Sequence, residues 1–127
     1  MSNKNKKIKI LVVDDMASMR KVTTHILTAL GYSNVEQADD GRSAVIKLRQ
    51  KEYDLVITDW NMPGMTGLDL LKHIRGNAEL AGLPVLMITA EGSRKQVIEA
   101  ARAGVNSYIM KPFSGAMLEK KLEKVLE

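Results

Sequence analysis

Five short apolar runs alternate with helical stretches along the chain, and this alternation limits the possible folds more than any other feature. The runs occupy residues 8–13, 35–38, 55–58, 84–88 and 105–110. The first run, residues 8–13, consists almost entirely of Val, Ile and Leu, which is typical of a strand that is buried on both faces of a parallel sheet. Because right-handed crossovers place helices on both faces of such a sheet, we expect a three-layer α/β sandwich with five parallel strands.

The segments between these runs have the spacing of helices with one apolar face. The apolar positions fall into five sets: Met19, Val22, Ile26, Leu27 and Leu30; Ala44, Val45 and Leu48; Leu68, Leu71 and Ile74; residues 97–103; and Met117, Leu118, Leu122, Val125 and Leu126. Gly31 and Gly104 stand where helices commonly end. No segment has the composition of a linker, so the sequence predicts one domain over residues 1–127.

Composition excludes several classes of site. The chain contains no cysteine, which excludes disulfides, thiolate catalysis and zinc–cysteine centres. No apolar run approaches the roughly 20 residues that span a bilayer. The polar start of the chain, residues 1–9, lacks the apolar segment of a secretory signal. We therefore expect a cytoplasmic protein that does not bind a membrane.

The formal charge of +4 has two interpretations. Lys4, Lys6, Lys7 and Lys9 supply much of it, and they favour either an acidic partner or nucleic acid, or else simply a solvated terminus. Only 4% of the residues are aromatic, and they do not alternate with basic residues. Single-strand binding surfaces combine both features, so we expect no nucleic-acid binding.

Charged and hydroxyl side chains follow the predicted strands. Asp14 and Asp15 follow the first strand, Asp59 the third, Thr89 the fourth and Lys111 the fifth. Each has a simpler interpretation when taken alone, since acids cap helices, threonine is common in strands and lysine is common on surfaces. The carboxyl ends of parallel strands share one edge of the sheet, however, so these side chains are expected to converge.

Three carboxylates in one crevice repel one another unless a hard cation joins them, and Mg²⁺ prefers oxygen ligands. We expect Asp14 and Asp15 to hold Mg²⁺ and Asp59 to act as a nucleophile that forms an aspartyl phosphate. Lys111 would then bind a phosphoryl oxygen as a point charge, and Thr89 would donate a hydrogen bond to the phosphoryl group.

Four stretches carry a resemblance to a known family. They are Leu-Val-Val-Asp-Asp at 11–15, Asp-Trp-Asn-Met-Pro at 59–63, Thr-Ala-Glu at 89–91, and Tyr108 followed by Lys-Pro-Phe at 111–113. In this order and at this spacing the chain resembles response-regulator receiver domains, in particular the chemotaxis regulators of the CheY type. The resemblance implies a flavodoxin-like (βα)5 fold with strand order 2-1-3-4-5.

The resemblance also implies roles for particular residues. Asp14, Asp15, Asp59 and the backbone carbonyl of Asn61 would surround Mg²⁺, and Asp59 would accept phosphate from a CheA-like histidine kinase or a small acyl phosphate. The resemblance further implies that Thr89 and Tyr108 form the switch pair and that the peptide bond before Pro112 is cis. Asn61 and Glu91 match positions that tune how fast water removes the phosphate. The implied target is a FliM-like flagellar motor switch protein, a separate phosphatase is possible, and we expect a monomer.

One surface is expected to carry the output. Arg94, Lys95, Tyr108, Phe113 and Lys121 would form a basic face with aromatic anchors, although the three cations also fit an ordinary solvated helix face. Two positions depart from the family pattern. Gly92 replaces the usual alanine and Met110 replaces the usual valine. We expect both departures to affect motor binding more than phosphorylation.

The sequence leaves other functions open. The favoured one is a stand-alone phosphorylation switch that catalyses only its own phosphorylation and dephosphorylation. A phosphate sink or relay intermediate would use the same chemistry without motor binding. A Mg²⁺-dependent aspartate-nucleophile phosphatase is disfavoured because Asp14-Asp15-Met16 lacks the Asp-x-Asp spacing of such enzymes.

Overall fold

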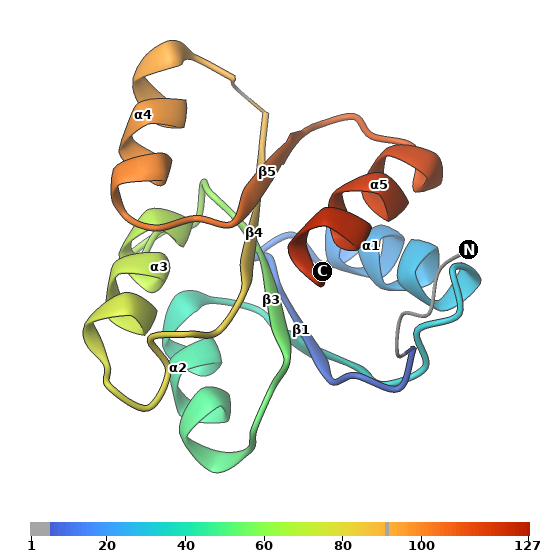
Figure 1. The fold of residues 1–127 in the computed structure, drawn as a ribbon, viewed down its shortest axis with the longest axis horizontal. Helices are drawn as coiled ribbons and strands as arrows, with labels where there is room; N and C mark the ends of the chain where they lie inside the picture. Colours follow the sequence, from blue (N-terminus) through green and yellow to red (C-terminus); the bar gives the residue numbers. More distant parts are fainter. Residues whose placement is uncertain (1–5, 91) are drawn as a thin grey trace.

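Five parallel strands form one sheet in the order β2-β1-β3-β4-β5 (Figure 1). The computed structural model describes residues 6–90 and 92–127. The strands are β1 (Ile10–Val13), β2 (Val35–Ala38), β3 (Leu55–Asp59), β4 (Val85–Thr89) and β5 (Ser107–Met110). The helices are α1 (Ala17–Ala29), α2 (Gly41–Gln50), α3 (Gly67–Gly76), α4 (Arg94–Arg102) and α5 (Gly115–Val125). This arrangement confirms the predicted α/β class and strand order.

Helices cover both faces of the sheet: α1 and α5 lie on one face, and α2, α3 and α4 lie on the other (Figure 1). Side chains alternate along each strand, so each face has its own apolar core. In β1, Leu11 and Val13 belong to the cluster beneath α2, α3 and α4, whereas Ile10 and Val12 pack with Leu27 of α1 in the opposite cluster. This two-sided burial explains why the central strands β1, β3 and β4 are almost entirely apolar, whereas the edge strand β2 contains Glu36 and Gln37.

Some predicted boundaries shift by one or two residues. β1 starts at Ile10 because the backbone of Lys9 bonds Asp54 outside the sheet ladder. The Lys9 N–H donates to the Asp54 carboxylate, and the Lys9 carbonyl accepts the Asp54 N–H. β5 starts at Ser107 because the Val105 amide bonds the end of α4 at Ala100. Asp59 and Thr89 are the last residues of their strands rather than the first residues after them.

Two residues predicted for inner helix faces are exposed. Val22 of α1 is 48% exposed, and the buried positions of that helix are Thr23 and Leu27. The prediction was wrong because it counted only apolar residues, while the inward row of α1 contains a threonine. Met117 of α5 is likewise exposed, because Leu118 and Leu122 form the buried row.

The ends of the helices are fixed by side chains and by glycine. Gly31 and Gly104 follow α1 and α4 with φ of 103° and 92°, in the left-handed region that favours glycine. At the start of α3, Thr66 and Asp69 form a complete capping box, in which each side chain accepts the other residue's backbone N–H. Within the described residues, no helix is long and apolar enough to cross a membrane.

Candidate functional site

Three carboxylates meet at the carboxyl edge of the sheet. Asp14 and Asp15 directly follow β1, and Asp59 ends the adjacent strand β3. One ligand oxygen from each of the three lies within 4.8 Å of the others. The structure thus brings together the three acids that the sequence singled out, in a group that fits a hard divalent cation.

Burial differs among the acids. Asp14 is 2% exposed and Asp59 is 4% exposed, while Asp15 faces solvent. Asp14 Oδ1 accepts the backbone N–H of Met16 at 2.9 Å, and Arg20 Nη1 donates to the Asp14 carbonyl at 2.6 Å. These bonds fix the loop after β1. Met16 is the N-cap of α1 and has no side-chain cap, so the carboxylates themselves do not cap that helix.

Lys111 reaches the acids from the end of β5. Its Nζ lies 3.0 Å from Asp59 Oδ1 and 3.9 Å from Asp14 Oδ2. Burial raises the pKa of Asp59, Lys111 acts in the opposite direction, and the charges of Asp14 and Asp15 raise it further. Lys111 therefore offsets only part of the negative charge, which leaves an attraction for a cation.

Thr89, which ends β4, is 3% exposed. Its Oγ1 donates to Oε1 of Gln96, in the first turn of α4, at 3.2 Å. The sequence analysis did not identify Gln96. The signal available for it was the Ser-x-x-Gln pattern of residues 93–96, which is typical of a helix start.

A small cavity of about 10 Å³ adjoins this hydrogen bond. Its lining residues come from the loop directly after β3 and from β4, α4 and β5: Trp60, Met87, Thr89, Gln96, Val97, Ala100 and Tyr108. Tyr108 is half-buried, and Lys121 Nζ of α5 lies 5.4 Å from the centre of its ring. Tyr108 and Thr89 therefore border the same space, which is the arrangement that a coupled switch pair needs.

Gly67 is a second residue of the site that the sequence analysis missed. A Cβ at this position would lie 2.1 Å from the carbonyl oxygen of Asp59, and the Gly67 amide bonds the Trp60 carbonyl at 2.9 Å. Any side chain there would push α3 away from the strand end that carries Asp59. A glycine opening a helix three residues after a Pro-Gly turn was the available signal.

The remaining positions implied by the family resemblance are distributed as follows. Asn61 is exposed, two residues after Asp59. The Lys111–Pro112 peptide bond is cis. Glu91 lies outside the described residues.

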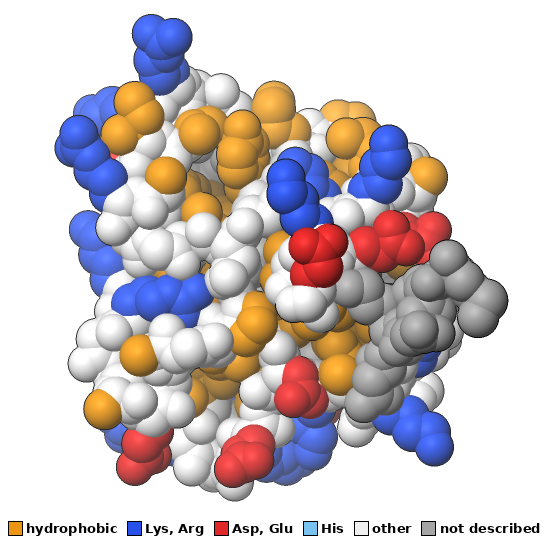
Figure 2. All heavy atoms as spheres, viewed as in Figure 1, with side chains coloured by type: hydrophobic (Ala, Val, Ile, Leu, Met, Phe, Trp, Pro, Cys, Tyr) orange, Lys and Arg blue, Asp and Glu red, His pale blue; other side chains and the backbone are white. Residues whose placement is uncertain are grey.

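The residues of the expected output face lie on or beside α4, β5 and α5. Arg94 and Lys95 are exposed on the first turn of α4, and Lys and Arg side chains line the outer edge of the molecule over this helix (Figure 2). Phe113, however, packs against the core cluster beneath α1 and α5, whereas Tyr108 packs against the opposite one. Phe113 and Tyr108 are nevertheless both half-buried, so each keeps part of its ring accessible.

Gly92 and Met110 contact each other on this face. A Cβ at Gly92 would lie 2.4 Å from Met110 Sδ, and Met110 is 46% exposed. The methionine side chain thus fills the space that a side chain at position 92 would need. The two departures from the family pattern are sterically coupled.

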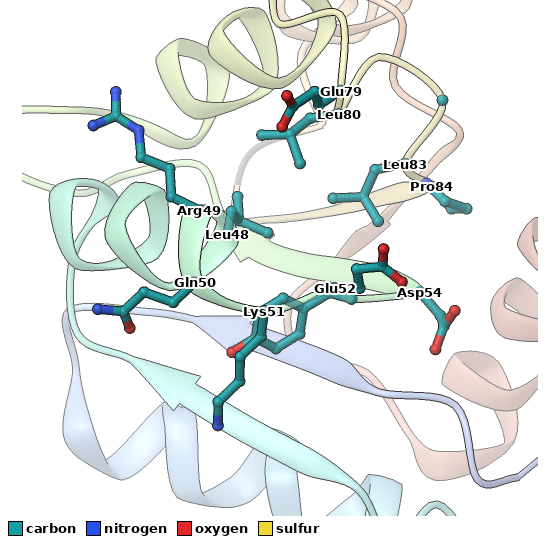
Figure 3. A pocket seen from close by; sticks show the side chains of 12 residues that line it. Leu48, Arg49, Gln50, Lys51, Glu52, Asp54, Glu79, Leu80, Leu83 and Pro84 are labelled. Carbon is teal, nitrogen blue, oxygen red and sulfur yellow. The ribbon is translucent and has the colours of Figure 1, made fainter.

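An open groove of about 740 Å³ lies at the other end of the sheet, by the amino ends of β3 and β4. Leu48, Leu80 and Leu83 turn toward one another in it, and Arg49 and Lys51 extend away from them (Figure 3). The acids at the carboxyl edge are not part of this groove. The groove is therefore separate from the cluster of carboxylates and Lys111.

Comparisons with known proteins agree with this geometry. The family described as the response regulator receiver domain matches residues 10–123. The chain is 56% identical over 123 residues to the chemotaxis protein CheY-3 of Vibrio cholerae serotype O1, covering 97% of this chain and 95% of that protein. It is 51% identical over 120 residues to the chemotaxis protein CheY of Pseudomonas aeruginosa, covering 94% of this chain and 97% of that protein.

A solved structure extends the likeness to three dimensions. The chemotaxis response regulator CheY4 of Vibrio cholerae superposes with a TM-score of 0.87 at 38% identity, covering 94% of this chain and 99% of that one. The family match spans the whole sheet and all the helices except the last two residues of α5, and it includes every acid of the cluster. The chain therefore belongs to the response regulator receiver domain family and is of the CheY type.

Proposed function

We propose that this protein is a phosphorylation switch that accepts a phosphoryl group on Asp59 and then changes its binding to a partner protein. The observation that carries the proposal is the cluster of Asp14, Asp15 and Asp59, with ligand atoms within 4.8 Å, and Lys111 Nζ 3.0 Å from Asp59. A buried carboxylate beside a lysine and two further acids has both a nucleophilic oxygen and the means to bind a phosphoryl group.

The reaction is an in-line displacement at phosphorus. A carboxylate oxygen of Asp59 forms the new P–O bond, while the P–N bond of a phosphohistidine or the P–O bond of an acyl phosphate breaks. The bonding electrons leave with the imidazole or the carboxylate of the donor. Lys111 lowers the pKa of Asp59 against the effect of burial and so favours its ionised, reactive form, and it remains beside the phosphoryl oxygens after transfer.

Asp14, Asp15, Asp59 and the backbone carbonyl of Asn61 are the proposed ligands of Mg²⁺. When bound, this ion would neutralise charge on the phosphoryl oxygens during transfer. The support for the ion is the chemistry of the donor set: three carboxylates that a single lysine only partly offsets.

The chemotaxis setting is supported by the names of the relatives, which are chemotaxis proteins. We accordingly propose a CheA-like histidine kinase as the donor and a FliM-like flagellar motor switch protein as the target, with both encounters in the cytoplasm. In this proposal the protein catalyses only its own phosphorylation and dephosphorylation.

One observation favours a second candidate, a phosphate sink or relay intermediate without motor binding. Met110 fills the space beside Gly92 on the expected output face, so the shape of that face departs from the family pattern. Affinity for a motor switch peptide, measured with and without acetyl phosphate, separates the two. Tighter binding after phosphorylation supports the motor, and equal binding supports the sink.

The phosphoacceptor proposal is tested by intact-protein mass spectrometry after incubation with acetyl phosphate and Mg²⁺. The wild type is expected to gain about 80 Da, the mass of one phosphoryl group, and Asp59→Asn to gain nothing. A chelator is expected to abolish the gain. Equal gains in wild type and variant would refute the proposal.

A further inference from the structure

Gln96 makes a hydrogen bond that phosphoryl transfer itself does not require. Its Oε1 accepts the hydroxyl of Thr89 at 3.2 Å, which joins the end of β4 to the first turn of α4. Thr89 is almost fully buried and Gln96 is half-buried, so water competes only weakly for this bond. The contact therefore holds the hydroxyl of the proposed switch residue in one direction.

A hydroxyl group carries a single proton. Thr89 therefore cannot donate to Gln96 and to a phosphoryl oxygen on Asp59 at the same time. Because phosphoryl oxygens are charged acceptors, they form the stronger of the two bonds. Gln96 and a phosphoryl group on Asp59 thus compete for the same proton.

The side chain of Gln96 also has an unused alternative partner. Ser93 is the N-cap of α4, and its side chain accepts the Gln96 N–H at 3.2 Å, which is the forward half of a capping box. In a complete box the third residue of the helix also accepts the N-cap N–H. Between these two described residues the reciprocal bond is not formed, since the Gln96 side chain is directed to Thr89.

Helix α3 shows the complete motif in the same molecule. There Asp69 Oδ2 accepts the Thr66 N–H at 3.1 Å, and Thr66 Oγ1 accepts the Asp69 N–H at 3.1 Å. Gln96 occupies the position in α4 that Asp69 occupies in α3. Release of Thr89 would leave Gln96 able to complete the second box.

We propose that Gln96 is a two-position latch. In the unphosphorylated protein it holds the Thr89 hydroxyl, and after phosphorylation of Asp59 it releases Thr89 and accepts the backbone N–H of Ser93. Gln96 is a positioning residue that acts through Thr89, and it transmits the state of Asp59 to the start of α4. This inference rests on the proposed function of Asp59.

The test is residue-resolved amide hydrogen exchange, measured by NMR with and without beryllium fluoride and Mg²⁺. Beryllium fluoride copies the tetrahedral shape and charge of a phosphoryl group on a carboxylate, and calorimetry establishes that it has bound. In the wild type we expect exchange at Ser93 N–H to slow at least about threefold on binding, as one added hydrogen bond requires. The Thr66 N–H, already bonded to Asp69, is the internal control and should not change.

Two variants make the test specific. In Thr89→Val the hydroxyl is gone, so Gln96 is released and exchange at Ser93 N–H should be slow even without beryllium fluoride. In Gln96→Leu the acceptor is gone, so exchange at Ser93 N–H should stay fast in both states. Glu99→Gln on the same helix is the matched control and should behave like the wild type.

Each contrary result has one meaning. Binding of beryllium fluoride without slower exchange at Ser93 N–H in the wild type would overturn the latch and leave the phosphoacceptor proposal intact. Fast exchange at Ser93 N–H in free Thr89→Val would do the same. Failure of the wild type to bind beryllium fluoride in the presence of Mg²⁺ would overturn both proposals.

Discussion

Lys111 and Asp59 form an ion pair across the end of an intervening strand. Nζ lies 3.0 Å from Oδ1, and the two side chains are 19% and 6% exposed. Asp59 ends β3 and Lys111 follows β5, so the lysine reaches past the end of β4. Such a pair forms only when all three strands are in register, which ties the charge at the site to the fold.

Replacement of Lys111 by methionine should separate phosphoryl chemistry from metal binding. We expect the rate of phosphorylation by acetyl phosphate to fall by about 100-fold, because a charge that stabilises the phosphoryl oxygens is lost. Affinity for Mg²⁺ should not fall, because a cation is removed from beside Asp14 and Asp59. Mass spectrometry and calorimetry measure the two quantities, and a parallel loss of both would argue against the assigned role.

Removal of the charge at Asp59 should stabilise the metal-free protein. Burial is the main cause that raises the pKa of this carboxyl, so its ionised form opposes folding. We expect Asp59→Asn to increase the free energy of unfolding by on the order of 1 kcal/mol near pH 7 in a chelator. Urea unfolding measures this free energy. A lower stability of Asp59→Asn would contradict the conclusion that the buried charge of Asp59 opposes folding.

The same carboxyl gives the metal-free wild type a predictable dependence on pH. Between its ordinary pKa, about 3.9, and its raised pKa, the native state binds more protons than the unfolded state at Asp59. The contribution of Asp59 to stability therefore decreases as pH rises through that window. The stability difference between Asp59→Asn and wild type should shrink on acidification and should not grow.

Gly92 and Met110 should behave as a coupled pair. Gly92→Ala alone forces the flexible, exposed side chain of Met110 to move and should cost about 0.5 kcal/mol of stability. With Met110→Val the space is open, and the same alanine should cost little. Urea unfolding of the two single variants and the double variant completes the cycle. Strictly additive effects of the two substitutions would show that Gly92 and Met110 have no coupling energy.

Arg75 should matter for stability alone. Its guanidinium donates to the carbonyls of Gly104, Ala81 and Leu83 and to Asn106 Oδ1, at 2.6–3.1 Å. Arg75→Ala should therefore lower the free energy of unfolding by about 1 kcal/mol, because four acceptors lose a charged donor and one of these bonds, to the Leu83 carbonyl, is partly buried. Phosphoryl uptake at a temperature where the variant stays folded should be unchanged. A selective loss of uptake would link these loops to the site.

Much of the site could be predicted because it depends on strand ends. The apolar runs before Asp14, Asp59 and Lys111 identify the strands, and parallel pairing then forces these residues to one edge. Helix faces were harder to predict. Thr23 is buried while its neighbour Val22 is exposed, and a pattern that counts only apolar residues cannot distinguish them.

Contacts between different elements were not predictable from the pattern. The bond from Thr89 to Gln96 depends on how closely α4 approaches the end of β4, which no local spacing fixes. The contact of Gly67 with Asp59 likewise depends on how α3 docks against the sheet. The core cluster against which Phe113 packs was likewise not predictable, because the direction of the chain after β5 is a tertiary property.

The most direct test of the account locates the phosphoryl group. After treatment with acetyl phosphate and Mg²⁺, reduction with borohydride converts an acyl phosphate to an alcohol, and trypsin then separates residues 10–20 from residues 52–72. The account predicts the alcohol at Asp59 in the second peptide and an unmodified first peptide that contains Asp14 and Asp15. Modification of the first peptide, or of neither, would contradict it.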